Sequence, residues 1–234
     1  EQETVRKDFI AHISHDLRTP LSIARGYTET LLIKEKDGSL TKEEQERYKQ
    51  MILNKIFQVE HMVTQLFELS KIESAAFQLN KEPFVFSEIV QEVVNNFHLV
   101  AAEKQVRLEC LQTQNHVWVN ADIHMMERVV QNLVENAIKN TLPGGIVKVY
   151  IETDGNNLVT KVSNTGTLLI SRLIEWVNST EKQSNSYGMR PSKSGLGLMI
   201  VKRILLLHQS SLSVQVTADQ NIFTFGLPVI TPGS

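Results

Sequence analysis

The sequence predicts an α+β protein in which a helical hairpin, paired with a second copy as a dimeric four-helix bundle, precedes an α/β sandwich. Residues 1–74 contain two long segments whose apolar residues recur at spacings of three and four, which is helical periodicity. After residue 84, helical and strand-like segments alternate, and turn signals join several strands. Mixed helices and antiparallel strands imply a sandwich with the helices packed on one face of a sheet.

The first two helices are expected to form the hairpin. Asp37-Gly38 supplies a stop for the first helix, and Thr41 with Glu44 three residues later forms a capping box that starts the second. Apolar residues of the second helix alternate spacings of four and three, as in a coiled coil; they are Ile52, Ile56, Val59, Val63 and Leu66. Two helices bury too little surface to be stable alone, so we expect a homodimer.

The remaining elements are assigned from periodicity and turn residues. We expect helices at 87–103, 122–141 and 196–208, a polar loop at 179–194, and strands at 106–111, 117–119, 147–153, 158–162, 212–216 and 222–227. The predicted domain organisation is a hairpin at 1–74, a linker at 75–83 and the sandwich at 84–230.

Composition narrows the possible partners. The net charge of -2 argues against general affinity for nucleic acid or anionic membranes. Cys110 is the single cysteine and cannot form an internal disulfide, which favours a reducing compartment. No apolar run approaches the roughly 20 residues that span a bilayer. We therefore expect a cytoplasmic segment without membrane contact, and the absence of an initiating Met suggests a piece of a longer protein.

His15 is predicted to face water. The apolar residues of the first helix centre on one direction, and His15 falls roughly 180° away at about 100° per residue. Asp16 is its neighbour, and Thr19 lies one turn on along the same side. A carboxylate beside an imidazole holds one ring nitrogen protonated and leaves the other with a lone pair that can attack a phosphorus atom.

The run Ser14-His15-Asp16-Leu17-Arg18-Thr19-Pro20-Leu21 resembles the H box of sensor histidine kinases, the transmitters of bacterial two-component systems. The resemblance implies that His15 is the phosphoacceptor and Asp16 its acid/base partner. It further implies that Thr19 positions water when the domain dephosphorylates a response regulator. The implied partners are a second copy of the chain and the receiver domain of that regulator, and the implied setting is the cytoplasmic part of a membrane-anchored sensor.

The second half resembles the ATP-binding domain of the same family, shared with gyrase-type ATPases. Residues 126–141 match its asparagine box, in which Asn132 and Asn136 share one helix face. Amide oxygens suit Mg²⁺, a hard cation that prefers oxygen ligands. The resemblance implies that Asn136 coordinates the Mg²⁺ bound to ATP and that Lys139 approaches the phosphates.

A glycine motif follows the asparagine box. Gly195, Leu196 and Gly197 open the helix predicted at 196–208, where free backbone N–H groups and the helix dipole favour an anion. In this order along the chain the motif resembles the second glycine box of the family. The resemblance implies that these three residues contact the nucleotide.

The adenine pocket departs from the family pattern, which normally reads Asp-x-Gly-x-Gly. Here the stretch is Asn164-Thr165-Gly166-Thr167-Leu168, so an amide replaces the acid and Leu168 replaces the second glycine. Asn221-Ile222 replaces a pair of small, hydroxyl-bearing residues before the last strand. A neutral hydrogen bond contributes about 1 kcal/mol where a charged one contributes about 1.5–3, so we expect weakened nucleotide binding.

Three functions fit these patterns to different degrees. The first is the catalytic core of a sensor histidine kinase that transfers the ATP γ-phosphate to His15 and then to an aspartate of a response regulator. The second is a transmitter with an impaired nucleotide site that acts as a phosphatase or a dimeric scaffold. The third is a gyrase-like ATPase, which the place of Glu135, directly before Asn136, argues against.

Overall fold

The computed structural model describes residues 2–74, 76–112, 116–179 and 196–231, with side chains at Ala11 and from Ile13 onward. It divides into a helical unit up to Ser70 and a sheet-containing unit that begins at Lys71 and includes the C-terminal residues from Gly197. None of the helices in the described part of the chain has the length and apolar character that a bilayer crossing requires.

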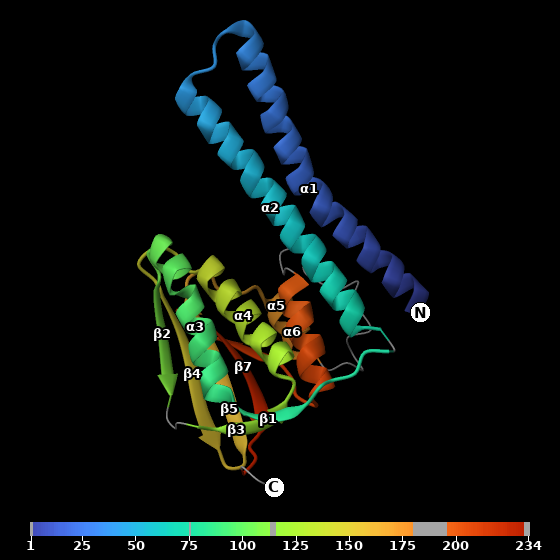
Figure 1. Cartoon of the computed structure of the whole chain (residues 1–234), viewed down its shortest axis with the longest axis vertical. Helices are drawn as coiled ribbons and strands as arrows, with labels where there is room; N and C mark the ends of the chain where they lie inside the picture. The colour runs from blue at the N-terminus through green and yellow to red at the C-terminus, as the bar shows by residue number, and fades with distance from the viewer. Residues whose placement is uncertain (1, 75, 113–115, 180–195, 232–234) are drawn as a thin grey trace. The chain divides into compact units, whose positions relative to one another are not determined.

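The helical unit is a hairpin of α1 (Gln2–Asp37) and α2 (Lys42–Ile72), as shown in Figure 1. The predicted capping box is confirmed: the Glu44 backbone N–H donates to Thr41 Oγ1 (3.1 Å), and the Thr41 N–H donates to a Glu44 carboxylate oxygen (3.3 Å). Lys34 Nζ lies 2.6 Å from Glu44 Oε1 and joins the two helices beside the turn. This hydrogen bond raises the pKa of Lys34 and lowers that of Glu44.

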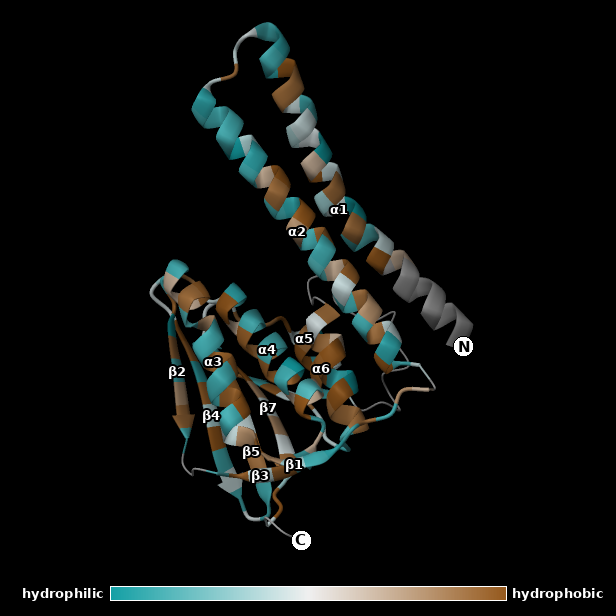
Figure 2. Ribbon diagram, viewed as in Figure 1, coloured by the Kyte–Doolittle hydropathy of each residue, from teal (hydrophilic) through white to brown (hydrophobic). Residues whose placement is uncertain are grey.

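The hairpin leaves much of its apolar surface uncovered, as expected of half a bundle. Tyr48 and Leu69 are buried, and the ring centres of Tyr27 and Tyr48 lie 5.9 Å apart. Figure 2 shows further hydrophobic residues along both helices. The exposed ones are Leu21, Ile23, Leu32, Ile33, Leu53, Ile56, Phe57 and Phe67. Covering such a face by a second hairpin removes it from water, which favours the predicted dimer.

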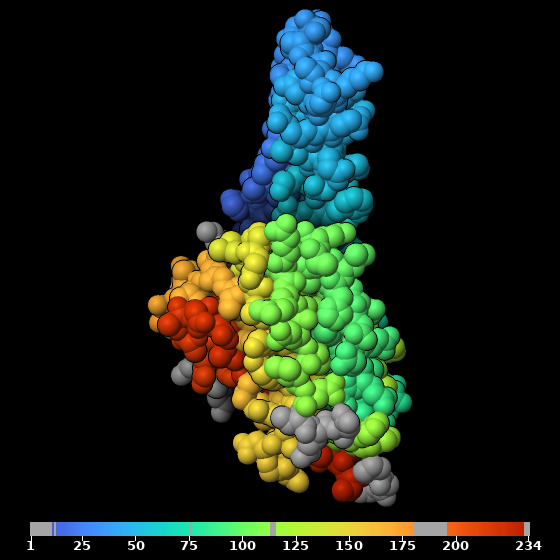
Figure 3. All heavy atoms as spheres, turned by 90° about the vertical axis from the view of Figure 1, so that its left-hand side faces the viewer, coloured from blue at the N-terminus to red at the C-terminus, as the bar shows by residue number. Residues whose placement is uncertain are grey.

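The sheet-containing unit is built on a five-stranded sheet with the order β2-β4-β5-β7-β6. Its strands are β2 (Arg107–Gln112), β4 (Ile146–Asp154), β5 (Asn157–Thr165), β6 (Ser213–Val216) and β7 (Gln220–Pro228). The edge strand β2 faces the viewer in Figure 3. Three neighbouring pairs are antiparallel as expected, but β2 and β4 are parallel. The chain between them returns to the same end of the sheet through a helix, which sequence periodicity does not reveal.

Four helices in the described part of this unit lie on one side of the sheet, as predicted (Figure 1). They are α3 (Phe86–Glu103), α4 (Ile123–Asn140), α5 (Ser171–Asn178) and α6 (Leu196–Leu207). On β5 the residues Leu158, Val162 and Asn164 point into this core and are buried. The predicted helix starting at Asp122 is confirmed, because its Oδ1 accepts from the Met125 N–H (3.1 Å) as an N-cap.

Two elements were not predicted. Strand β1 (Glu82–Val85) begins in the predicted linker at 75–83 and pairs antiparallel with β3 (Trp118–Ala121), which buries Phe84. Helix α5 follows β5 over a segment that the sequence left unassigned. Of the predicted loop 179–194, all but Ser179 lies outside the described residues.

His208 and Asp122 together join three parts of this unit through hydrogen bonds. Its Nε2 accepts from the Asp122 backbone N–H (3.1 Å), so the proton resides on Nδ1, which lies 2.8 Å from the Ile204 carbonyl oxygen. Asp122 Oδ2 in turn accepts from the Asn80 N–H (3.0 Å). Burial lowers the pKa of His208 from its usual 6.5, because a charged ring is poorly solvated there.

We predict that His208 makes the unit less stable in acid. Since its folded-state pKa is lowered, the unfolded chain takes up the proton first as pH falls, and stability decreases below pH 6.5. One such group contributes a slope of at most about 1.4 kcal/mol per pH unit. Urea unfolding at about pH 7.5 and about pH 5.5 measures it. The slope should shrink in His208→Gln and persist in His98→Gln, an exposed control; equal slopes in both would refute the assignment.

Candidate functional site

His15 lies on the water-facing side of α1, as predicted from its helical phase. Its side chain is 74% exposed, and its Nδ1 is 3.7 Å from Asp16 Oδ1. The Asp16 side chain is 19% exposed, so the carboxylate is partly shielded from water. A carboxylate next to Nδ1 favours the tautomer protonated there and leaves the Nε2 lone pair free to act as a nucleophile.

Thr19 and Pro20 follow on the next turn of the same helix. The Thr19 hydroxyl donates to the His15 carbonyl oxygen (3.2 Å), so its oxygen lone pairs remain available for a water molecule. Pro20 has no N–H to donate to the preceding turn, yet α1 continues through it to Asp37. The turn after His15 therefore offers an acceptor oxygen on the exposed surface.

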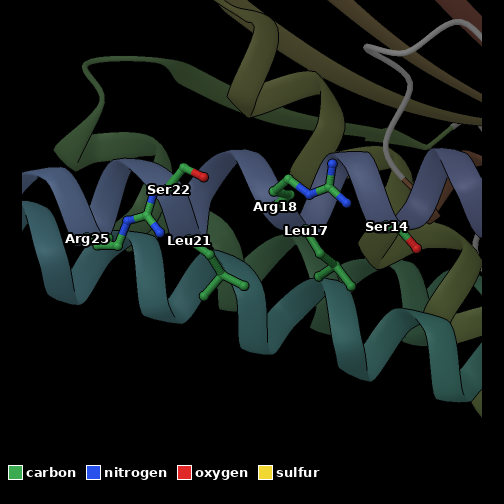
Figure 4. A pocket seen from close by; sticks show the side chains of 6 residues that line it. All are labelled: Ser14, Leu17, Arg18, Leu21, Ser22 and Arg25. Carbon is green, nitrogen blue, oxygen red and sulfur yellow. The ribbon is translucent and has the colours of Figure 1, made fainter.

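A shallow groove of about 420 Å³ runs along α1 beside His15. Figure 4 shows its lining: Ser14, Leu17, Arg18, Leu21, Ser22 and Arg25. Leu17 and Leu21 extend toward α2 in this view, and the two guanidinium groups lie along the same stretch of helix. The two arginines add positive charge beside this groove, whose apolar residues include Leu21, one of those that the predicted dimer covers.

The predicted asparagines lie on one face of α4. Asn132 is buried and donates through Nδ2 to the Arg128 carbonyl (2.9 Å), whereas Asn136 is half-buried and Lys139 is exposed. Asn140 donates through Nδ2 to both the backbone oxygen (2.7 Å) and Oδ1 (3.0 Å) of Asn136. Sequence reasoning missed this contact, which orients the Asn136 amide oxygen while leaving its second lone pair free.

The end of β5 meets the end of α4 at Gly166. Gly166 has φ +143°, and a Cβ there would be 2.5 Å from the Asn140 carbonyl oxygen, so only glycine fits. The contact brings the stretch from Asn164 to Gly166 beside the asparagine-bearing helix, as the predicted nucleotide site requires. Asn164 is 2% exposed, and among the described residues its Nδ2 has no hydrogen-bond acceptor.

Asn221 holds the segment that follows Gly166. It is 1% exposed on β7, directly opposite Asn164 in the β5–β7 pair. Its Oδ1 accepts from the Leu169 N–H (2.9 Å), and its Nδ2 donates to the Thr167 carbonyl (3.0 Å). The sequence marked Asn221 only as a departure from a family pattern; its use as a backbone clamp became evident from the fold.

Two of the three remaining predicted residues, Leu196 and Gly197, lie at the start of α6. Gly195 is outside the described residues, while Leu196 is buried and Gly197 half-buried in the first turn. Farther along α6, Lys202 Nζ donates to the Trp176 carbonyl (2.7 Å) and the Ser179 carbonyl (3.2 Å) and lies 4.8 Å from the Trp176 ring centre. Burial lowers the pKa of Lys202. These contacts fasten the end of α5 to α6.

An exposed nucleophilic histidine on a helical hairpin, followed by a helix-on-sheet unit with an asparagine-bearing helix, defines a two-domain phosphotransfer protein. Residues 5–75 match the family model of the His Kinase A (phospho-acceptor) domain. Residues 121–231 match that of the histidine kinase-, DNA gyrase B- and HSP90-like ATPase, an ATP-binding domain. The chain belongs to the sensor histidine kinases, of which it represents the transmitter part.

Related proteins agree with this assignment. The chain is 33% identical over 208 residues to an uncharacterized sensor-like histidine kinase of Rhizobium meliloti (strain 1021), a match covering 88% of this chain and 39% of that protein. It is 25% identical over 215 residues to the sensor protein SrrB of Staphylococcus aureus, covering 91% and 36%. The chain therefore spans well under half the length of these relatives.

Solved structures share the fold. The histidine kinase ThkA, in complex with the response regulator protein TrrA, matches with a TM-score of 0.77 at 22% identity, over 98% of this chain and 64% of that one. The Acinetobacter baumannii histidine kinase AdeS matches with a TM-score of 0.68 at 24% identity, over 93% and 98%. At these identities the likeness concerns the fold alone.

We predict that Gly166→Ala lowers both stability and nucleotide affinity. The new Cβ meets the Asn140 backbone, which cannot move without shifting α4, in addition to the cost of the positive φ. We expect a loss of about 3 kcal/mol or more in urea unfolding. Gly144→Ala is the matched control, because Gly144 also has a positive φ but no atom lies within 4 Å of its added Cβ. Equal losses in both variants would show that the contact is unimportant.

Proposed function

We propose that this chain is the ATP-dependent protein-histidine kinase core of a two-component sensor, acting as a homodimer in the cytoplasm. The observation that carries the proposal is the exposed His15 imidazole with the Asp16 carboxylate 3.7 Å from Nδ1, within a phospho-acceptor domain that precedes an ATPase domain. A buried histidine or one without an acidic neighbour would not support it.

The reaction follows from the chemistry of His15. The Nε2 lone pair attacks the γ-phosphorus in line, the bond from that phosphorus to the bridging oxygen breaks, and ADP leaves with the electron pair. Asp16 holds the Nδ1 proton and stabilises the positive charge that develops on the ring. A receiver-domain aspartate of a response regulator then attacks the phosphohistidine and takes the phosphoryl group. Thr19 is assigned to the separate phosphatase activity, in which it positions the water that attacks the aspartyl phosphate of the regulator and releases inorganic phosphate and the free aspartate.

The nucleotide site is assigned to the end of α4 and the end of β5. Asn136 offers a half-buried amide oxygen with one free lone pair, which would serve as a protein ligand for the Mg²⁺ that accompanies ATP. Such an ion neutralises charge on the phosphates. Lys139 is exposed one turn after Asn136 and is assigned to the phosphates, as are Gly195, Leu196 and Gly197. Asn132 lies on the same helix face as Asn136 and supports it. Asn164 and Gly166 are assigned to the surroundings of the base.

The partner surface is assigned to the groove along α1. Arg18 and Arg25 lie on α1 near the phosphorylated position, so acidic groups of a receiver domain fit beside them. The histidine kinase ThkA, which shares the fold, forms a complex with a response regulator protein, and this supports a regulator as the partner of the present chain.

We predict that the dimer incubated with Mg²⁺ and γ-labelled ATP acquires acid-labile label on His15. His15→Gln should abolish the label because it removes the nucleophile, while His98→Gln, at an exposed position of the other unit, should leave it unchanged. Label that survives in His15→Gln would disprove the assignment. Absence of label in the wild type, with regulator dephosphorylation retained, would favour a phosphatase.

We predict that Asn140→Ala weakens the affinity for Mg·ATP about 2- to 10-fold, the effect of one lost hydrogen bond. Without the Asn140 amide, the Asn136 oxygen loses its fixed orientation toward the metal. Calorimetric titration with ATP should show the loss in Mg²⁺ and a smaller change in EDTA. Equal losses under the two conditions would mean that Asn140 acts on the fold rather than on the metal ligand.

A further inference from the structure

Asn164 carries a buried donor that the protein itself does not satisfy. The residue is 2% exposed at the end of β5, on the same face of the sheet as Val162, and its Nδ2 has no acceptor among the described residues. Buried polar groups almost always have partners, because a buried donor without an acceptor is costly. Its position where β5 approaches α4 makes a bound ligand the natural source of the missing acceptor.

The side chains opposite Asn164 on the two neighbouring strands do not supply that acceptor. Its register partner on β4 is the apolar Val147, and the one on β7 is Asn221. The Asn221 Oδ1 accepts from Leu169 and its Nδ2 donates to Thr167, and neither atom is hydrogen-bonded to Asn164 Nδ2. Gly166, two residues on, has no side chain to offer.

We propose that Asn164 recognises the purine base of the nucleotide as an amide, so that this site admits guanine and hypoxanthine nucleotides beside ATP. The inference rests on the proposed nucleotide function. Adenine presents an N6 donor next to the N1 acceptor, whereas guanine and hypoxanthine present the O6 acceptor next to an N1 donor. An amide holds one donor group and one acceptor group and matches either order by turning about its Cβ–Cγ bond.

A carboxylate at this position would discriminate, because ionised oxygens only accept hydrogen bonds and repel O6. Discrimination by a site often depends on such a repulsive element, and Asn164 lacks it. The wild type should therefore bind ATP, GTP and ITP with affinities within about tenfold of one another. Asn164→Asp should raise the preference for ATP over GTP by a further 10- to 100-fold, roughly the effect of one charged hydrogen bond.

Calorimetric titration of the full chain with Mg²⁺ and ATP, GTP, ITP or CTP tests this. The matched control is Asn95→Asp, which adds the same charge at an exposed position of α3, and thermal unfolding checks that each variant is folded. The expected result is binding of the three purine nucleotides by the wild type, weaker binding of CTP, and a selective loss of GTP and ITP in Asn164→Asp.

Two results would overturn the inference and leave the kinase proposal intact. One is tight ATP binding by the wild type with GTP and ITP more than about 100-fold weaker. The other is equal binding of all four nucleotides, which would mean that the base is not recognised. Failure of ATP itself to bind would instead reject the nucleotide function and the inference with it. If Asn164→Asp does not fold, the wild-type affinities alone decide.

Discussion

The backbone of Gly166 passes against the Asn140 carbonyl oxygen with no room for a side chain between them. This contact holds the end of β5 and the end of α4 in one fixed relation. Asn140 has two roles at this contact. Its backbone carbonyl leaves no room for a side chain at position 166, and its side-chain amide orients Asn136. The proposed metal ligand on α4 and the proposed base-recognising residue on β5 thus depend on the same few atoms, which explains why a glycine is needed there.

The sequence predicted correctly those features that depend on residues close together along the chain. The capping box at Thr41, the N-cap at Asp122 and the two-residue turn between β4 and β5 all depend on residues within a few positions of one another. The exposure of His15 followed from helical phase for the same reason. What sequence could not supply were contacts between distant segments: the parallel β2–β4 pair, strand β1 in a supposed linker, and the Asn221 clamp.

The helices of the two units differ in how much of their surface is buried. In the sheet-containing unit, α6 is enclosed and apolar around Ile200 and Ile204, so its polar groups need internal partners such as those of Lys202. In the hairpin, the apolar residues are shared between the hairpin's own interior and its open face, and the polar side is left to water. His15 can therefore stay solvated and nucleophilic on a helix whose opposite side is buried. A rigid scaffold and an accessible nucleophile are compatible because amphipathicity separates them.

Asn164 and Asn221 are directly opposite each other in the β5–β7 pair, and we assign them different roles. Asn221 uses its two polar atoms on two backbone groups of opposite character, an N–H at Leu169 and a carbonyl at Thr167. A carboxylate there would satisfy the first and repel the second, so the segment after Gly166 requires an amide. That amide is oriented by these two backbone groups and makes no hydrogen bond to the donor of Asn164. Asn221 thus fixes the segment after Gly166, while the Nδ2 of Asn164 stays without a partner among the described residues and is assigned to the base.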